Sequence, residues 1–130
     1  MSKQSQSDIF PANVVFFHEA ADDFRKLDQS RKTVVLKAIR KISTSPLMYG
    51  KPLGTQGVRA LAGFRSVYVD NASIRIIWIV GQQGTVQIVV VAGIAQREGM
   101  HVYDLVSSRK EDVYGLVYQL LRSSLGKPPC

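Results

Sequence analysis

The side chains of this sequence that could do chemistry are mainly cations and phenols in its second half. Arg97 is followed by His101 and Tyr103, and Arg65 lies upstream in a short apolar run. Arginine stabilises negative charge on a phosphate, while histidine and tyrosine can accept or donate protons. If the protein is an enzyme, this set of residues suits the movement of protons at a ribose hydroxyl next to a phosphate.

The sequence lacks the patterns of several other chemistries. It contains no glycine-rich phosphate loop and no dinucleotide-binding fingerprint. The histidines, His18 and His101, have no Cys, His or carboxylate at metal-ligand spacing, and the acidic residues give no convergent pair for a magnesium nuclease or a glycosidase. The single cysteine, Cys130, allows no internal disulfide, which suits a reducing cytoplasm. We therefore expect a cytoplasmic protein with no metal and no cofactor.

Length and charge restrict the size and the partners of the protein. The 130 residues suit one domain, and a composition of 45% hydrophobic and 21% charged residues is that of a folded globular protein. The net charge is +7, which favours a polyanionic partner: a nucleic acid, an acidic protein or an anionic membrane surface. No apolar run approaches the roughly 20 residues of a membrane span, so we expect no transmembrane segment.

The N-terminal half predicts a strand followed by two helices. Residues 1–12 are mostly polar and are expected to form a flexible leader. The run 13–18 is apolar and rich in β-forming residues, which is typical of a strand. From residue 19 the apolar positions recur at helical spacing, and the pattern predicts a helical hairpin over 19–44 with an apolar inner face and a basic outer face. Prolines and glycines then predict a loop over 46–58.

The second half predicts three strands and a helix. Apolar and β-branched residues fill 64–70, 74–80 and 86–92, and the short turns between them favour an antiparallel meander. A helix with an apolar stripe follows from residue 101, and Gly115 inside it predicts a break or bend.

The element order β-α-α-β-β-β-α indicates an α+β domain. We expect a single domain over 13–125, in which the helical hairpin and the C-terminal helix pack on one face of a small antiparallel sheet. Residues 126–130 are expected to form a frayed tail.

Three segments of the sequence resemble the RelE/ParE toxin superfamily. They are VVFFHEAADDFRKLD (14–28), GFRSVYV (63–69) and QREGMHVYDLVSSR (96–109). GFRSVYV is similar to the family's glycine-aromatic-arginine strand. The last segment is similar to the family's ending, an arginine after the final strand followed by a valine-tyrosine pair and a further arginine. The resemblance spans 13–109 and implies a RelE/ParE-like fold, because the order of elements also fits.

The resemblance implies a bacterial toxin that pairs with a small antitoxin protein. Many RelE-like members cut mRNA on the ribosome without a metal, by driving a 2′-hydroxyl against the adjacent phosphate. ParE-like members inhibit DNA gyrase instead. The implied function is a metal-independent endoribonuclease, an mRNA interferase of a type II toxin–antitoxin system. A gyrase-inhibiting toxin and an inactive RelE-fold binding module remain as alternatives.

The resemblance implies catalytic roles for Arg97, Tyr103 and Arg65. Arg97 matches the arginine that would bind the scissile phosphate and stabilise its charge. Tyr103 matches a tyrosine that would stack on a base or move a proton, and Arg65 matches the arginine of the second strand as a phosphate contact. Each has a structural alternative: a solvated loop arginine, a tyrosine packed beside the helix stripe, and an arginine paired with a carboxylate.

We expect Arg59, Lys51 and His101 to bind the substrate. RelE-like nucleases often carry a pair of lysines where this sequence has Arg59 among apolar neighbours. Lys51 is a candidate substitute, with a solvated loop lysine as its alternative. His101 lies within the third segment, and a histidine side chain titrates near neutral pH. On a regular helix, however, it would point away from Tyr103.

Overall fold

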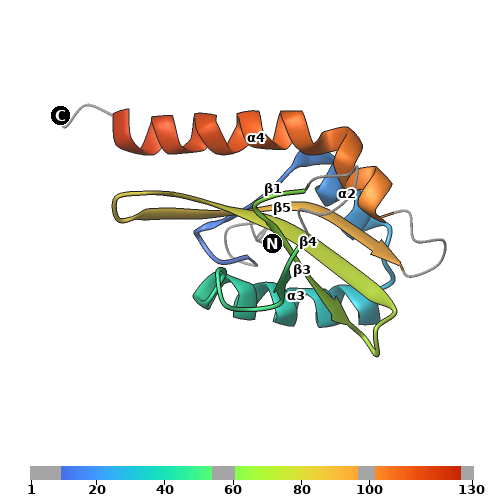
Figure 1. The fold of residues 1–130 in the computed structure, drawn as a ribbon. Coiled ribbons are helices and arrows are strands. Elements are labelled where there is room, and N and C mark those ends of the chain that lie inside the picture. The colour runs from blue at the N-terminus through green and yellow to red at the C-terminus, as the bar shows by residue number, and fades with distance from the viewer. Residues whose placement is uncertain (1–9, 54–60, 97–101, 127–130) are drawn as a thin grey trace, which may run out of the picture.

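The computed structural model describes residues 10–53, 61–96 and 102–126 (Figure 1). The expected order of strands and helices is confirmed. The structure also contains a short strand that was not expected, β2, within the stretch predicted to be a loop. The elements are β1 (Val14–Phe16), α2 (His18–Arg25), α3 (Gln29–Thr44), β2 (Lys51–Pro52), β3 (Phe64–Val69), β4 (Ile74–Gln83), β5 (Val86–Gln96) and α4 (Val102–Gly126).

The strands form one sheet in the order β1-β5-β4-β3-β2. β3, β4 and β5 make the antiparallel meander expected from their short connections, and β2 adds antiparallel to β3. β1 lies parallel to β5, with Val14 opposite Val89 and Phe16 opposite Val91. The sheet is therefore mixed rather than wholly antiparallel. β1 and β5 are joined through two helices and the meander, and so long a connection does not impose an antiparallel pair.

The central strands are apolar on both faces. Ile76, Ile77, Trp78 and Ile79 follow one another in β4, and all four are buried. Because neighbouring side chains of a strand point to opposite faces, such a run needs cover on both sides. The helices therefore cover both faces of the sheet, rather than one as expected: α3 lies against one face and α4 against the other (Figure 1).

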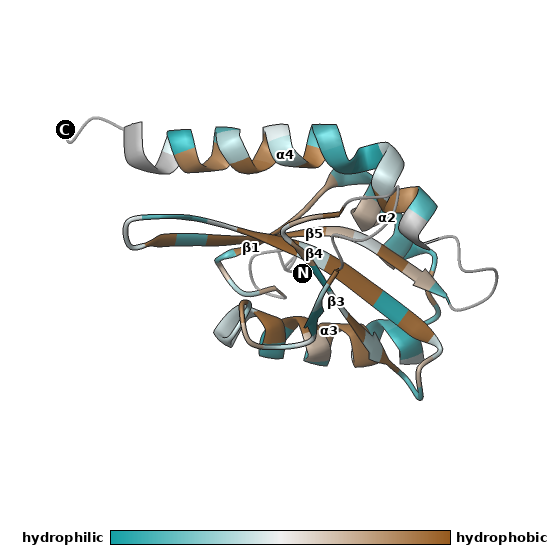
Figure 2. Cartoon of the chain, viewed as in Figure 1, coloured by the Kyte–Doolittle hydropathy of each residue, from teal (hydrophilic) through white to brown (hydrophobic). Residues whose placement is uncertain are grey.

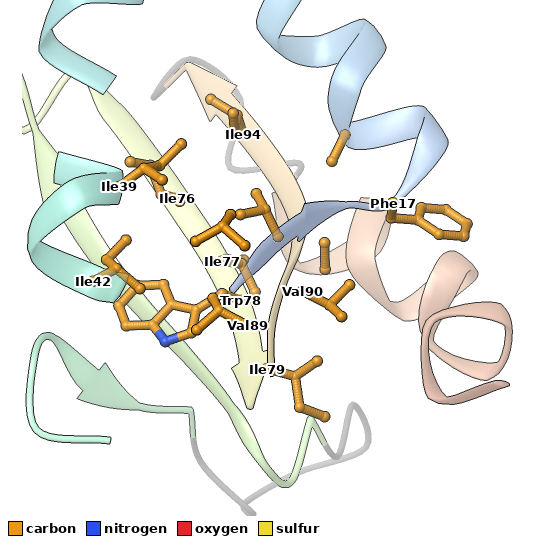
Figure 3. Close-up of a cluster of buried hydrophobic side chains, with 14 of the residues drawn as sticks. Phe17, Ile39, Ile42, Ile76, Ile77, Trp78, Ile79, Val89, Val90 and Ile94 are labelled. Carbon is orange, nitrogen blue, oxygen red and sulfur yellow. The ribbon is translucent and has the colours of Figure 1, made fainter. Parts of the chain in front are cut away.

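α3 packs on the face that carries Trp78. Ile39 and Ile42 of the helix lie close to Ile76 and Trp78 in the core (Figure 3). The indole Nε1 of Trp78 donates a hydrogen bond to the Pro46 carbonyl at 3.1 Å. The loop that follows α3 is thus fixed to the core together with the helix.

α3 begins after a capping residue, Asp28. Its carboxylate accepts hydrogen bonds from the Arg31 backbone N–H at 2.9 Å and from the Ser30 hydroxyl at 3.0 Å. The bond from Arg31, followed by that from Ser30, lowers the pKa of Asp28 below its usual value. The cap and its negative charge both favour the start of a helix at this point.

α4 covers the opposite face and lies close to the backbone of β4 and β5. A Cβ at Gly81 would lie 2.5 Å from the Val117 side chain, and a Cβ at Gly93 would lie 3.1 Å from Val106. α4 is continuous through Gly115, and it bends in its N-terminal part without a break (Figure 1). Its apolar residues face the sheet and its polar residues face outward (Figure 2), as in an amphipathic helix.

α2 lies along the part of β5 that β1 does not reach. Asp23 accepts a hydrogen bond from the Ile94 backbone N–H at 3.1 Å, and Arg109 of α4 donates one to the Ala92 carbonyl at 2.8 Å. Side chains thus satisfy backbone groups that a longer β1 would have paired. This stretch of the sheet edge is closed to a further strand.

The N-terminal core begins inside the expected leader. Phe10 is buried, and its ring centroid lies 4.6 Å from that of Phe16 and 5.6 Å from that of Phe24. These three rings form one aromatic cluster between the chain entry, β1 and α2. Phe10 therefore belongs to the packed domain rather than to a flexible leader.

The turn between β3 and β4 has a left-handed backbone. Asp70, Asn71 and Ala72 have φ values of 57°, 56° and 68°. Asparagine and aspartate adopt this conformation readily. In alanine the Cβ crowds the carbonyl oxygen that follows, at a cost of about 1 kcal/mol or more. Ala72 is therefore a strained position of the turn that aligns β3 with β4.

Ala72→Gly is expected to raise the free energy of unfolding by up to about 1 kcal/mol, because glycine adopts positive φ without this crowding. Urea unfolding followed by circular dichroism measures the change. Ala38→Gly, in the middle of α3, is the control and is expected to lower stability, since glycine disfavours a helix interior. A loss of stability in Ala72→Gly would show that the turn is unstrained.

Candidate functional site

Arg65, an expected catalytic residue, points to the α3 side of the sheet, because it pairs with Trp78 across the strands. Its Nε donates a hydrogen bond to the Tyr49 carbonyl at 3.0 Å, and its Nη2 donates one to the Gly50 carbonyl at 3.1 Å. The guanidinium thus holds the loop before β2. Its hydrogen-bond partners are backbone carbonyls, and not the carboxylate that the structural alternative for Arg65 would require. In this arrangement Arg65 positions the loop.

The opposite face of β3 carries Phe64, Ser66 and Tyr68, as strand alternation predicts. Phe64 packs on Tyr114 of α4, with ring centroids 5.6 Å apart. Tyr68, further along the strand, is 50% exposed. Among the described residues, α4 therefore covers one part of this face, and the part that carries Tyr68 stays open.

The open part is built around Arg75 of β4, which was not predicted as a site residue from the sequence. Arg75 pairs with Tyr68 on one side and with Ala95 of β5 on the other. Its guanidinium carbon lies 4.5 Å from the centroid of the Tyr68 ring, and its Nη2 donates a hydrogen bond to the Ser66 hydroxyl at 3.3 Å. These contacts fix the direction of the cation on the sheet.

A signal for Arg75 is present in the sequence. It is the one charged residue of the segment Ile74–Val80, whose other members are all apolar. A charge inside a buried strand is costly unless it is paired or serves a function. The family's glycine-aromatic-arginine pattern directed attention to Arg65 instead, which stands on the other face.

Lys51 joins the same open face. It lies directly opposite Ser66 in the β2–β3 pair, so its side chain rises on the side of Ser66 and Tyr68, where it is exposed. We call Lys51, Ser66, Tyr68 and Arg75 together the Arg75 surface. Two cations beside an aromatic ring can bind a phosphate and a neighbouring base.

The chain leaves the sheet beside the Arg75 surface. Ala95 opposes Arg75, and the next residue, Gln96, ends β5. The Gln96 side-chain oxygen accepts a hydrogen bond from Arg31 Nη1 of α3 at 3.1 Å. This contact ties the start of α3 to the residue that directly precedes Arg97 in the sequence.

The other expected site residues are not placed by the structure. Arg59, Arg97 and His101 lie outside the described residues. Tyr103 is in the first turn of α4, and its side chain lies outside the described part as well. The structure thus places Lys51 and Arg75 on one face of the sheet. The roles of Arg59, Arg97, His101 and Tyr103 remain predictions.

Arg109, the final arginine of the third sequence segment, is internal and only 6% exposed. Its Nη1 lies 3.0 Å from an Asp23 carboxylate oxygen, and its Nε lies 2.9 Å from a carboxylate oxygen of Glu19. Together with its bond to the Ala92 carbonyl, these contacts join α4 to α2 and β5. Arg109 therefore positions α4.

Two further features are absent from the described part of the chain. Within residues 10–53, 61–96 and 102–126, no three His, Cys, Asp or Glu side chains gather as a metal-ligand group. Over these ranges, no helix has both the length and the apolar character needed to cross a bilayer.

Comparisons with known proteins give matches among solved structures. No protein-family profile and no curated protein matches the chain. The isolated E. coli RelE toxin matches with a TM-score of 0.53 and 20% identity, over 75% of this chain and 96% of RelE. A chain of the RelBE2 toxin–antitoxin complex from Mycobacterium tuberculosis matches with a TM-score of 0.53 and 28% identity, over 68% of this chain and 94% of that one.

A third solved structure, the YoeB/ParE toxin from Agrobacterium tumefaciens, has a TM-score of 0.54 and 21% identity, over 65% of this chain and 98% of the toxin. Each of these solved chains is thus covered almost completely, over 94–98% of its length. These similarities show that the chain has the fold of the RelE/ParE toxins.

Proposed function

We propose that this protein is the toxin of a toxin–antitoxin system and that it cleaves mRNA at the ribosome without a metal. The observation that carries the proposal is the Arg75 surface, where two cations and a tyrosine stand on an open sheet face beside the end of β5. The similar structures include a RelE toxin alone and RelE-type toxins with their antitoxins. This supports a toxin role and an antitoxin as partner.

In the proposed reaction, the 2′-oxygen of a ribose attacks the adjacent phosphorus while the bond from phosphorus to the 5′-oxygen breaks. The 2′-hydroxyl gives up its proton to a base, and the departing 5′-oxygen gains one, which leaves a 2′,3′-cyclic phosphate. Arg75 and Arg97 stabilise the charge on the phosphate oxygens, and Lys51 adds positive potential beside them. Tyr103 moves a proton or stacks on a base, while Arg59 and His101 bind the strand.

Induced expression in a bacterial host without a partner protein, followed within minutes by mapping of new mRNA 5′ ends, tests this function. The proposal predicts growth arrest with fresh cuts inside translated codons. Arrest with intact mRNA and inhibited supercoiling would replace it with gyrase inhibition. Growth without arrest would leave a binding module and would contradict a toxin.

Arg75→Ala is expected to lower the rate of mRNA cleavage by about 10²–10³-fold, the typical effect of removing one donor that stabilises transition-state charge. Purified variants and a translating ribosome fraction measure the rate. Arg122→Ala is the matched control, because Arg122 lies over an exposed ring, that of Tyr118, at 5.7 Å on α4. If a folded Arg75→Ala variant cleaved mRNA at the wild-type rate, the Arg75 surface would have no part in the reaction.

A further inference from the structure

Tyr68 is the large aromatic side chain that the described part of the fold leaves open on the sheet, with 50% of it exposed. Other exposed large apolar side chains lie elsewhere: Leu47 and Met48 follow α3, and Tyr118 belongs to α4. Tyr68 differs from them because it stands next to the cations of the Arg75 surface.

Arg75 restrains the Tyr68 ring. The Arg75 guanidinium covers it at 4.5 Å in a cation–π contact, and Arg75 in turn donates a hydrogen bond to Ser66. Ser66 is buried, at 5% exposure, in the same strand. A ring fixed in this way gives up little conformational freedom when a planar group binds to it.

We propose that Tyr68 is a stacking platform for one nucleobase of a single-stranded RNA whose phosphates lie against Arg75 and Lys51. Every base has a π-face, so an aromatic ring can stack on it without reading the sequence. Single strands present these faces, whereas a duplex hides them. The inference rests on the proposed function, since it takes RNA as the ligand of this surface, and it assigns Tyr68 no proton transfer.

The test measures the affinity of the full-length protein for a short 2′-O-methyl oligoadenylate, which the proposed reaction cannot cleave. Fluorescence anisotropy gives the dissociation constant. Tyr68→Ala is expected to weaken binding by roughly 5- to 150-fold, which corresponds to the loss of one stacked base. Tyr68→Phe keeps the ring and is expected to bind within about twofold of the wild type.

Tyr118→Ala is the matched control for this substitution. Tyr118 is 62% exposed and lies under the guanidinium of Arg122, 5.7 Å away, so it reproduces the chemistry of Tyr68 and Arg75 on α4. Its removal is expected to leave the affinity for oligoadenylate unchanged. An equal loss in the two alanine variants would overturn a specific role of Tyr68.

A second probe separates stacking from charge. An abasic strand of the same length keeps the phosphates and lacks the bases, so the wild type and Tyr68→Ala are expected to bind it equally. The dependence of log Kd on log salt concentration is expected to stay the same in Tyr68→Ala. In Arg75→Ala its slope should fall by roughly 0.7 for each phosphate that the protein no longer neutralises.

The outcomes distinguish the inference from the function on which it rests. Equal affinity of the wild type and Tyr68→Ala for oligoadenylate would overturn stacking and leave the ribonuclease untouched. An equal loss of affinity for the abasic strand would also overturn it, because the effect would then come from a disturbed surface. Failure of the wild type to bind RNA, either free or on a ribosome, would instead contradict the proposed function.

Discussion

Arg109→Met is expected to lower the free energy of unfolding by about 3–5 kcal/mol, the usual cost of breaking a buried ion pair. Methionine keeps a long apolar stem, so the loss comes from the guanidinium contacts. The Asp23 carboxylate, 14% exposed, would lose its closest cation, and the Ala92 carbonyl would lose its donor. Because these contacts join α4 to α2 and β5, the helix would also be held less firmly.

Urea unfolding measures this loss, with Arg25→Met as the matched control. Arg25 pairs with Asp22 on the surface, where their side chains are 62% and 57% exposed, so its removal is expected to cost less than about 1 kcal/mol. Adding Asp23→Asn to Arg109→Met is expected to restore part of the stability, since the mostly buried carboxylate is then gone and the Glu19 carboxylate is 49% exposed to water. Equal costs for the two arginine variants would show that Arg109 does not anchor α4.

Gly50→Ala is expected to cost about 2–4 kcal/mol of stability, through a left-handed backbone and a steric overlap together. Gly50 has a φ of 70°, and a Cβ there would lie 2.5 Å from the Ser66 carbonyl oxygen and 2.7 Å from the Trp78 ring. The carbonyl belongs to β3 and cannot turn aside as a flexible side chain would. The shift would also disturb the hydrogen bond from Arg65 to the Gly50 carbonyl.

Gly84→Ala isolates the backbone contribution. Gly84 has a φ of 62°, and no atom lies within 4 Å of a Cβ built there. Its replacement should therefore cost only the left-handed conformation, about 1 kcal/mol. The urea midpoint of Gly50→Ala should therefore lie below that of Gly84→Ala, and the difference measures the cost of the steric overlap at Gly50. Similar midpoints for the two variants would mean that the β2 loop moves away from the sheet without cost.

The sequence predicted the elements of this fold well, because each has a strong local pattern. The helices show helical spacing of apolar residues, and the meander follows from β-branched runs joined by short turns. The parallel pairing of β1 with β5 was not predictable in this way. It depends on contacts between Val14 and Val89, which are distant in the sequence, and no local pattern encodes a partner so far away.

Of the site residues predicted from the sequence, Lys51 lies on the same face of the sheet as Arg75, and its role stays a prediction. Phe64, Ser66 and Tyr68 share that face of β3, as the alternation of side chains along a strand requires. Arg75 was not predicted as a site residue, because the family's glycine-aromatic-arginine pattern was matched to β3. The arginine on the open face belongs to β4. The face that an arginine occupies depends on strand pairing, and the two strands offer similar short motifs, FR in β3 and IR in β4.

The parallel edge strand also bears on how the protein emerges during synthesis. β1 pairs with Val89, Val90 and Val91, close to the end of the meander. A nascent chain that has not yet reached these residues already carries β1, α2 and α3 but lacks the strand on which β1 must be placed. This fold therefore closes only after β5 has left the ribosome.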